Sequence, residues 1–406
     1  MAPSTLPARV RAHAALAVAS LAIASGVVAI AQPTLGDYGT AHMGSNPDNA
    51  APAMAAIARG DLARVPHVQP VMGPVSLVVR APFAALGQAL GGRTLEYGLG
   101  AVACLWALAA LALVLAGRVR RRDGGVVAPA AVVLLLVANP LTLGALDAGH
   151  PEEVLAGALA AAAVLAAAED RATLTGILLA LGVATKPWAA LAVPPALHAL
   201  KGGHRRALGL TVGIAAALVA PLLLADAHPL VHGSRELAGA VRVYPASAWW
   251  PLADAVHARN LAHVHGAHAW AMPWGLTRSA GQLVVGALAL GAGLVHLRRW
   301  RALPLDVALA FLAALLLARS ALDPMNLAYY ALPFLVALVA WETTRRRGLP
   351  VVSALVAVAG WATLLHPRPD AALACALYLA WSLPLLAYLA TRGAPRRLAF
   401  VLPPNR

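Results

Sequence analysis

Long apolar runs recur along the whole chain and are separated by short basic loops, and this pattern constrains the fold more than any other feature. A helix needs about 20 apolar residues to cross the hydrocarbon core of a bilayer. With 60% hydrophobic and 12% charged residues, the 406-residue chain has more apolar surface than one water-exposed domain can bury. We therefore predict an all-α polytopic protein that forms a single integral membrane domain over residues 1–406.

The apolar runs predict about twelve transmembrane helices. The first run follows Arg9 and Arg11 and could also be a signal peptide, but its length favours a retained helix. The predicted spans are 13–31, 95–116, 126–146, 153–168, 172–185, 187–200, 207–225, 280–297, 303–318, 327–342, 349–365 and 371–390. Two of them, 172–185 and 187–200, are short and could form a broken pair that meets at Lys186-Pro187.

Arginine placement predicts the orientation of these helices. Most of the 31 basic residues fall in the loops that alternate spans assign to one side, and short cytoplasmic loops carry the excess of Lys and Arg. We therefore expect a plasma-membrane protein with both chain ends in the cytoplasm. The same distribution argues against nucleic acid as a partner, because the basic residues do not gather on one soluble face.

Two long segments, 32–94 and 226–279, are predicted to be outer loops. Within the first, Pro70 to Leu90 is apolar enough to span, but a crossing there would reverse every later loop. We interpret it as a re-entrant or juxtamembrane stretch packed against protein. Before it, Pro52 and Gly60 suit the start and end of a short helix, and its apolar side would carry Met54 and Leu62.

Asp37 is the first candidate for chemistry, because it lies between two glycines just after the first span. A carboxylate at that position can be approached closely by a substrate. The alternative is a solvated turn residue, since Gly and Asp are common in turns.

The outer turn from Asp147 to Glu153 carries three acids and His150 between two apolar helices. Pro151, Glu152 and Glu153 also suit the first turn of a helix, where acids meet the positive end of the dipole. Helix capping does not account for Asp147 and His150, so a binding site remains open there.

Lys186 is one of only two lysines in the chain, and it precedes a proline between two short apolar helices. An ionisable residue inside a membrane is costly and marks a functional site by default. Arg80 is a second cation inside an apolar run, with a snorkelling side chain as the alternative. Gln69, which precedes that run, is a weaker candidate, as is Asp48 in the first outer segment.

Several common catalytic motifs are absent from the sequence. It contains no Walker P-loop, no H-E-x-x-H, no G-x-S-x-G and no C-x-x-C. Both cysteines, Cys104 and Cys375, fall inside apolar stretches, so neither a disulfide framework nor a zinc site is indicated. No cofactor is expected.

The order of these features resembles the membrane-embedded glycosyltransferases of the GT-C superfamily, in particular glycosyltransferase family 87, the polyprenyl-phosphate-mannose-dependent α-mannosyltransferases of actinobacteria. The acid after the first helix, the juxtamembrane loop with its proline-flanked apolar segment, and the Gly-rich helix that ends in Lys186-Pro187 carry this resemblance. A Gly-Gln turn of the family corresponds to Gly149-His150. The resemblance covers residues 14–225, which would form the catalytic part, with 226–279 as a long outer loop and 280–406 as C-terminal helices.

This resemblance implies transfer of a sugar, such as mannose, from a polyprenyl-phosphate donor to a cell-envelope glycan or glycolipid at the outer face, with inversion and without a required metal. Asp37 would be the base. Lys186 and Arg80 would bind the donor phosphate, and the sugar or acceptor would be bound by Asp147, His150, Glu152, Gln69 and Asp48. Two alternatives remain, namely a transporter or flippase of a lipid-linked or anionic substrate, and a non-catalytic partner in envelope assembly.

Overall fold

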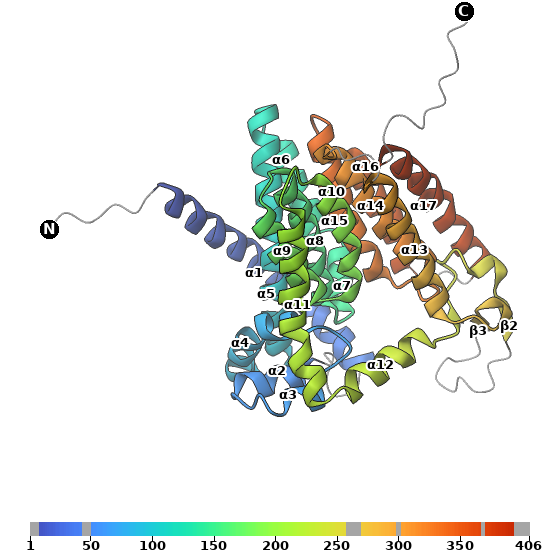
Figure 1. The fold of residues 1–406 in the computed structure, drawn as a ribbon. Helices are drawn as coiled ribbons and strands as arrows, with labels where there is room; N and C mark the ends of the chain where they lie inside the picture. Colours follow the sequence, from blue (N-terminus) through green and yellow to red (C-terminus); the bar gives the residue numbers. More distant parts are fainter. Residues whose placement is uncertain (1–7, 43–49, 257–268, 298–301, 367–369, 394–406) are drawn as a thin grey trace, which may run out of the picture.

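The protein is a bundle of apolar helices with a small three-stranded sheet at one end (Figure 1). The computed structural model describes residues 8–42, 50–256, 269–297, 302–366 and 370–393. The helices are α1 (Ala8–His42), α2 (Ala51–Ala58), α3 (Val65–Val68), α4 (Pro74–Gly91), α5 (Arg93–Asp123), α6 (Val127–Val137), α7 (Pro140–Asp147), α8 (Pro151–Ala168), α9 (Ala172–Val183), η1 (Pro187–Ala192), α10 (Val193–Ala199), α11 (His204–Ala225), α12 (His228–Ala238), η2 (Trp250–Leu252), η3 (Pro273–Gly275), α13 (Arg278–Leu297), α14 (Leu305–Leu322), η4 (Ala328–Ala331), α15 (Leu332–Arg345), α16 (Val351–Gly360), η5 (Trp361–Leu365) and α17 (Ala371–Gly393).

The predicted class is confirmed, because helices dominate and eight helical segments of the described chain are long and apolar enough to cross a membrane. They are Val10–Ala31, Arg93–Asp123, Val127–Asp147, Pro151–Ala168, His204–Ala225, Arg278–Val295, Leu305–Leu322 and Ala371–Arg392. The other four predicted spans are also helical but shorter. They correspond to α9, to η1 with α10, to η4 with α15, and to α16 with η5. The full count of twelve spans therefore stays a prediction.

The centre of the bundle is formed by α5, α8, α14 and α15, whose side chains are mostly buried against one another. Alanine is abundant in α8, so its neighbours can approach closely, as small residues allow in membrane bundles. A Cβ on Gly157 would lie 3.3 Å from Cα of Pro333, which shows how near α8 and α15 lie. In contrast, only Ala207 and Thr211 of α11 are buried.

The segment after α1 forms a cap at the end of the bundle, where α2, α3 and α4 lie below the long helices (Figure 1). Met54 is buried and packs with Leu77 and Ala81 of α4, whereas Leu62 is 65% exposed. The prediction that Met54 and Leu62 share one apolar side of a helix was therefore wrong. Met54 is buried against α4, whereas Leu62 lies beyond the end of α2 and is exposed. Within the described residues, α4 is not among the segments that are long and apolar enough to span, and the re-entrant or juxtamembrane placement stays a prediction.

The second long segment is more structured than a loop. It contains α12, which runs along the same end of the bundle as the cap (Figure 1). The antiparallel sheet follows in the order β1 (Arg242–Val243), β3 (Ala269–Ala271), β2 (Asp254–Val256). Arg242 pairs with Ala271, and Asp254 also pairs with Ala271 from the other side.

Candidate functional site

The interruption of the helix between α9 and η1 places a lysine inside the helical bundle. Proline disfavours helical backbone in the residue before it, and Lys186 adopts an extended conformation at φ −144° and ψ 127°. The preceding turn is closed by bonds from the backbone N–H groups of Thr185 and Lys186 to the carbonyl of Gly182. The broken pair predicted at Lys186-Pro187 is thus present.

The first turn of α8 faces this break. Gly149 has φ +78°, a conformation that favours glycine, and it ends α7 while Pro151 begins α8. Glu152 and Glu153 therefore occupy the first turn of α8, as predicted, and both are buried.

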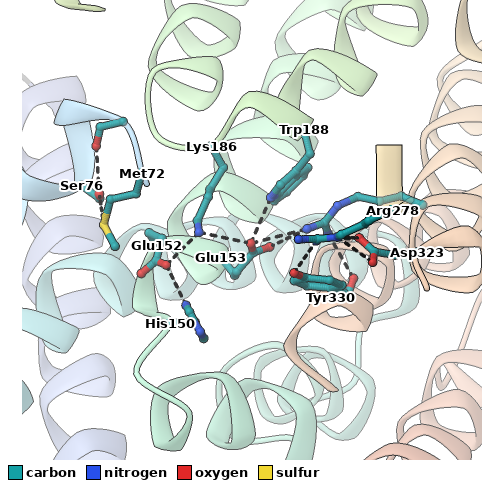
Figure 2. Close-up of polar contacts among 12 residues, drawn as sticks. Met72, Ser76, His150, Glu152, Glu153, Lys186, Trp188, Arg278, Asp323 and Tyr330 are labelled. Carbon is teal, nitrogen blue, oxygen red and sulfur yellow. Dashed lines mark hydrogen bonds and ion pairs between the residues drawn. The ribbon is translucent and has the colours of Figure 1, made fainter. Parts of the chain in front are cut away.

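Lys186 binds both glutamates, as Figure 2 shows. Its Nζ lies 2.9 Å from Oε1 of Glu152 and 3.7 Å from Oε1 of Glu153. His150 Nδ1 lies 2.9 Å from the same Glu152 oxygen. Among the described residues, Oε2 of Glu152 has no hydrogen-bond partner although it is buried. One carboxylate oxygen at the centre of the site is therefore unsatisfied.

Glu153 extends the site toward α14. The indole N–H of Trp188 donates to Oε1 of Glu153 at 3.2 Å, and Arg319 NH2 lies 3.5 Å from both carboxylate oxygens. The guanidinium of Arg319 also lies 4.5 Å from the ring centroid of Trp188. We call His150, Glu152, Glu153, Lys186 and Arg319 the Lys186 cluster.

Aromatic side chains line the cluster on the η4 side. The ring of Tyr329 lies 3.9 Å from that of His150, and the ring centroid of Tyr330 lies 4.6 Å from the guanidinium carbon of Arg319. Binding sites for small organic ligands commonly combine such rings with a few polar groups. The two tyrosine rings pack directly against His150 and Arg319 of the cluster.

Arg80 lies in α4, within the cap. It is fully buried, so the snorkelling alternative is wrong. The start of α4 is held against the Lys186 turn, because the N–H of Gly73 donates to the carbonyl of Thr185 at 2.9 Å. A Cβ on Gly73 would lie 1.8 Å from the carbonyl oxygen of Ala184, so only glycine fits this contact.

The other predicted site residues are distributed unevenly. Asp147 ends α7 and is half-buried two residues before the turn glycine, and Gln69 follows α3 with a buried side chain. In the described part of the chain, Oε1 of Gln69 has no hydrogen-bond partner. The backbone of Asp37 belongs to the last turns of α1, but its side chain lies outside the described residues, as does all of Asp48.

Sequence reasoning missed Arg319, Trp188 and the two tyrosines. Arg319 stands inside the apolar helix α14, and that position alone is a signal of function in a membrane protein. No local pattern could have found Trp188 or Tyr330, because the side-chain contacts of Trp188 with Glu153 and of Tyr330 with Arg278 join residues 35 and 52 positions apart.

No cluster of three His, Cys, Asp or Glu side chains in the described ranges is arranged to hold a metal ion. Comparison of the chain with protein-family models and with characterised protein sequences finds no match.

Proposed function

We propose that the protein transfers a sugar, such as mannose, from a polyprenyl-phosphate donor to a glycan or glycolipid acceptor of the cell envelope. The observation that supports this proposal is the group of charged side chains buried between the helices. Lys186 contacts Glu152 and Glu153, and Arg319 contacts Glu153. Lysine and arginine are the side chains that bind phosphate groups in proteins, so these two cations would favour binding of an anionic donor.

Lys186 has N–H groups that its two glutamate contacts do not use and that could bind such a donor. An ammonium group has three N–H donors, and only the Glu152 contact at 2.9 Å is within hydrogen-bonding distance of a carboxylate. In our proposal a phosphate oxygen takes a remaining N–H of Lys186, and Arg80 adds a second charge from the cap. Both groups would stabilise the negative charge that builds up as the phosphate leaves.

The reaction needs one base and no acid. The acceptor hydroxyl oxygen forms a bond to the anomeric carbon from the side opposite the phosphate, and the bond from that carbon to the phosphate oxygen breaks with its electron pair. The phosphate leaves as an anion, so no general acid has to protonate it, unlike the leaving group in glycoside hydrolysis. The hydroxyl proton passes to the carboxylate of Asp37 in this scheme.

Within this proposal the remaining polar residues bind sugar or acceptor hydroxyls. The unpaired Oε2 of Glu152 is an acceptor suited to a hydroxyl, and His150 is partly exposed beside it. Asp147, Gln69 and Asp48 would complete the set. The fold proposed here is GT-C-like, with residues 14–225 as the catalytic part.

The proposed site faces the outside of the plasma membrane, with both termini in the cytoplasm. An even number of crossings supports termini on the same side, and the count is even with eight spans or with all twelve. Arginine-rich loops, such as Arg120 to Arg122 at the end of α5, would then face the cytoplasm.

The test is transfer of radiolabelled mannose from polyprenyl-phosphate mannose to membrane acceptors by the wild type and by Asp37→Asn. Asp61→Asn is the matched control, because Asp61 is an exposed acid in the same outer segment. We expect product with the wild type and the control and none with Asp37→Asn. Equal labelling by Asp37→Asn would remove Asp37 from the role of base, and absence of transfer from any lipid-linked sugar would overturn the proposal.

A transporter or flippase of an anionic lipid is the second candidate, and the break at Lys186 favours it. Broken helices with charged or polar groups at the gap are typical of transporter binding sites. Proteoliposomes loaded with a fluorescent polyprenyl phosphate would distinguish the two functions. Movement of the lipid between leaflets without sugar transfer would favour transport, and absence of both activities in the wild type would favour a non-catalytic assembly partner.

A further inference from the structure

A cavity lies between α10, α11 and α13, apart from the Lys186 cluster. Its volume is about 700 Å³, within the roughly 300 to 1,000 Å³ common for sites that bind small molecules. Lys186 precedes η1 and Lys201 follows α10, so the cavity opens near the opposite end of this short helical segment from the cluster.

The walls of the cavity are apolar and its rim is basic. Leu197, Leu290 and Leu294 are among the wall residues, whereas Lys201, His204 and Arg205 are exposed at the rim. None of the described residues that line it is acidic. The nearby Asp170 accepts the backbone N–H groups of Lys201 and Gly202 at 3.1 Å each, which holds the basic loop in place.

Two hydrogen bonds of His198 hold the walls of the cavity together. His198 Nε2 lies 3.0 Å from the carbonyl oxygen of Gly293, which joins α10 to α13, and the N–H of Leu303 donates to the carbonyl of His198. A Cβ on Gly293 would lie 3.4 Å from Cβ of Pro194, so the two helices touch there. The cavity is therefore part of the fold and does not require a ligand to open it.

We infer that this cavity binds a phospholipid with a net negative headgroup, whose acyl chain packs against the leucines while its phosphate meets Lys201 and Arg205. Apolar walls suit an acyl chain, and basic pockets between membrane helices suit anionic headgroups. The complementarity of charge selects an anionic over a zwitterionic lipid. This inference does not rest on the proposed sugar transfer.

The test is native mass spectrometry of the delipidated full-length protein, titrated with phosphatidylglycerol and with phosphatidylcholine of the same acyl chains. We expect preferential binding of phosphatidylglycerol to the wild type. Each basic residue near a headgroup contributes about fivefold to binding, so Lys201→Gln with Arg205→Gln should weaken it by about 30-fold. Arg346→Gln with Arg347→Gln is the control, because these arginines are exposed but do not line the cavity.

A second variant tests the walls without changing a charge. Leu290 is 68% exposed, so Leu290→Trp can narrow the cavity without disturbing the core, and it should also weaken binding of phosphatidylglycerol. Equal binding of both lipids, or an equal loss in the Arg346 and Arg347 control, would overturn the inference. Unchanged binding in Leu290→Trp, or displacement of the lipid by inorganic phosphate alone, would show a surface charge effect and overturn it as well.

Discussion

The Lys186 cluster and the ion pair of Arg278 with Asp323 are both buried and share Tyr330 as a neighbour, yet their charges are satisfied differently. Arg278 donates to Asp323 through Nε at 2.9 and 3.1 Å and through NH2 at 2.7 Å, and it also reaches the Tyr330 hydroxyl at 2.6 Å. The N–H of Met325 donates to the same carboxylate. This pair is neutral, and both carboxylate oxygens accept hydrogen bonds.

The Lys186 cluster is open in comparison. Among the described residues it has an unpaired oxygen on Glu152, and the side chains of Lys186 and His150 are 13% and 20% exposed. A buried pair that only stabilises a fold gains from complete hydrogen bonding. An incomplete set of partners at an accessible point is what a binding site requires, so we propose a structural role for the Arg278 pair and a functional role for the Lys186 cluster.

Replacement of Lys186 should have the largest effect on activity. Lys186→Met removes a charge that the proposed reaction uses as the phosphate leaves, and loss of one such group lowers rates by about 100- to 1,000-fold. Arg59→Met is the control, because Arg59 is an exposed cation at the end of α2. Mannose transfer by purified protein measures both, and transfer by Lys186→Met at wild-type rates would assign the cluster to structure.

Removal of Asp323 should have the largest effect on stability. Asp323→Ala leaves Arg278 buried without its carboxylate, and breaking one partner of a buried pair costs about 3–5 kcal/mol. Thermal unfolding in detergent should show a lower midpoint, while transfer per folded molecule stays within about twofold of the wild type. An unchanged midpoint, or loss of activity in protein that is still folded, would contradict the division between the two sites.

Neutralising both partners sharpens the comparison further. Glu152→Gln with Lys186→Met removes both partners of the ion pair, so neither is left without the other. The loss of folding stability in the double variant should therefore be smaller than the sum of the losses in the two single variants. Coupling between contacting groups is typically about 0.5–3 kcal/mol. Transfer should stay as low as in Lys186→Met alone. Additive stability losses would mean that Glu152 and Lys186 do not interact in the folded protein.

The contrast also shows which parts of the structure were predictable. Pro151 and Pro187 act on neighbouring backbone, so the start of α8 and the break after α9 followed from local rules. The helices themselves followed from the apolar runs. The contacts of Asp323 did not follow from such rules, because it accepts the N–H of Met325 but has Arg278 as its main partner.

Contacts between distant segments could not be predicted in this way. The pairing of Arg319 with Glu153 joins residues 166 positions apart, and the contact of Gly73 with Thr185 depends on how the cap lies against the bundle. These arrangements arise from packing between helices, on which the local period of a sequence carries no information. The burial of Arg80 could not be predicted either, because an arginine in an apolar run can snorkel or be enclosed by neighbouring helices.

An exposed pair provides the smallest effect and the last contrast. His67 Nδ1 lies 2.7 Å from Oδ2 of Asp226, which directly follows α11, and the N–H of His228 donates to the other oxygen. The bond with His67, followed by the one from His228, holds the pKa of the Asp226 carboxyl below its ordinary value of 3.8.

A lowered pKa in the folded state means that this pair adds stability above about pH 3.8 and loses it as the pH falls through the folded value. Asp226→Asn should therefore unfold slightly more easily than the wild type at neutral pH, and the difference should vanish in acid. Asp254→Asn, which changes an exposed acid in β2, is the control. Because solvent screens the Asp226 pair, Asp226→Asn should lower folding stability far less than Asp323→Ala does. A comparable loss of stability would show that solvent exposure does not account for the difference between the two pairs.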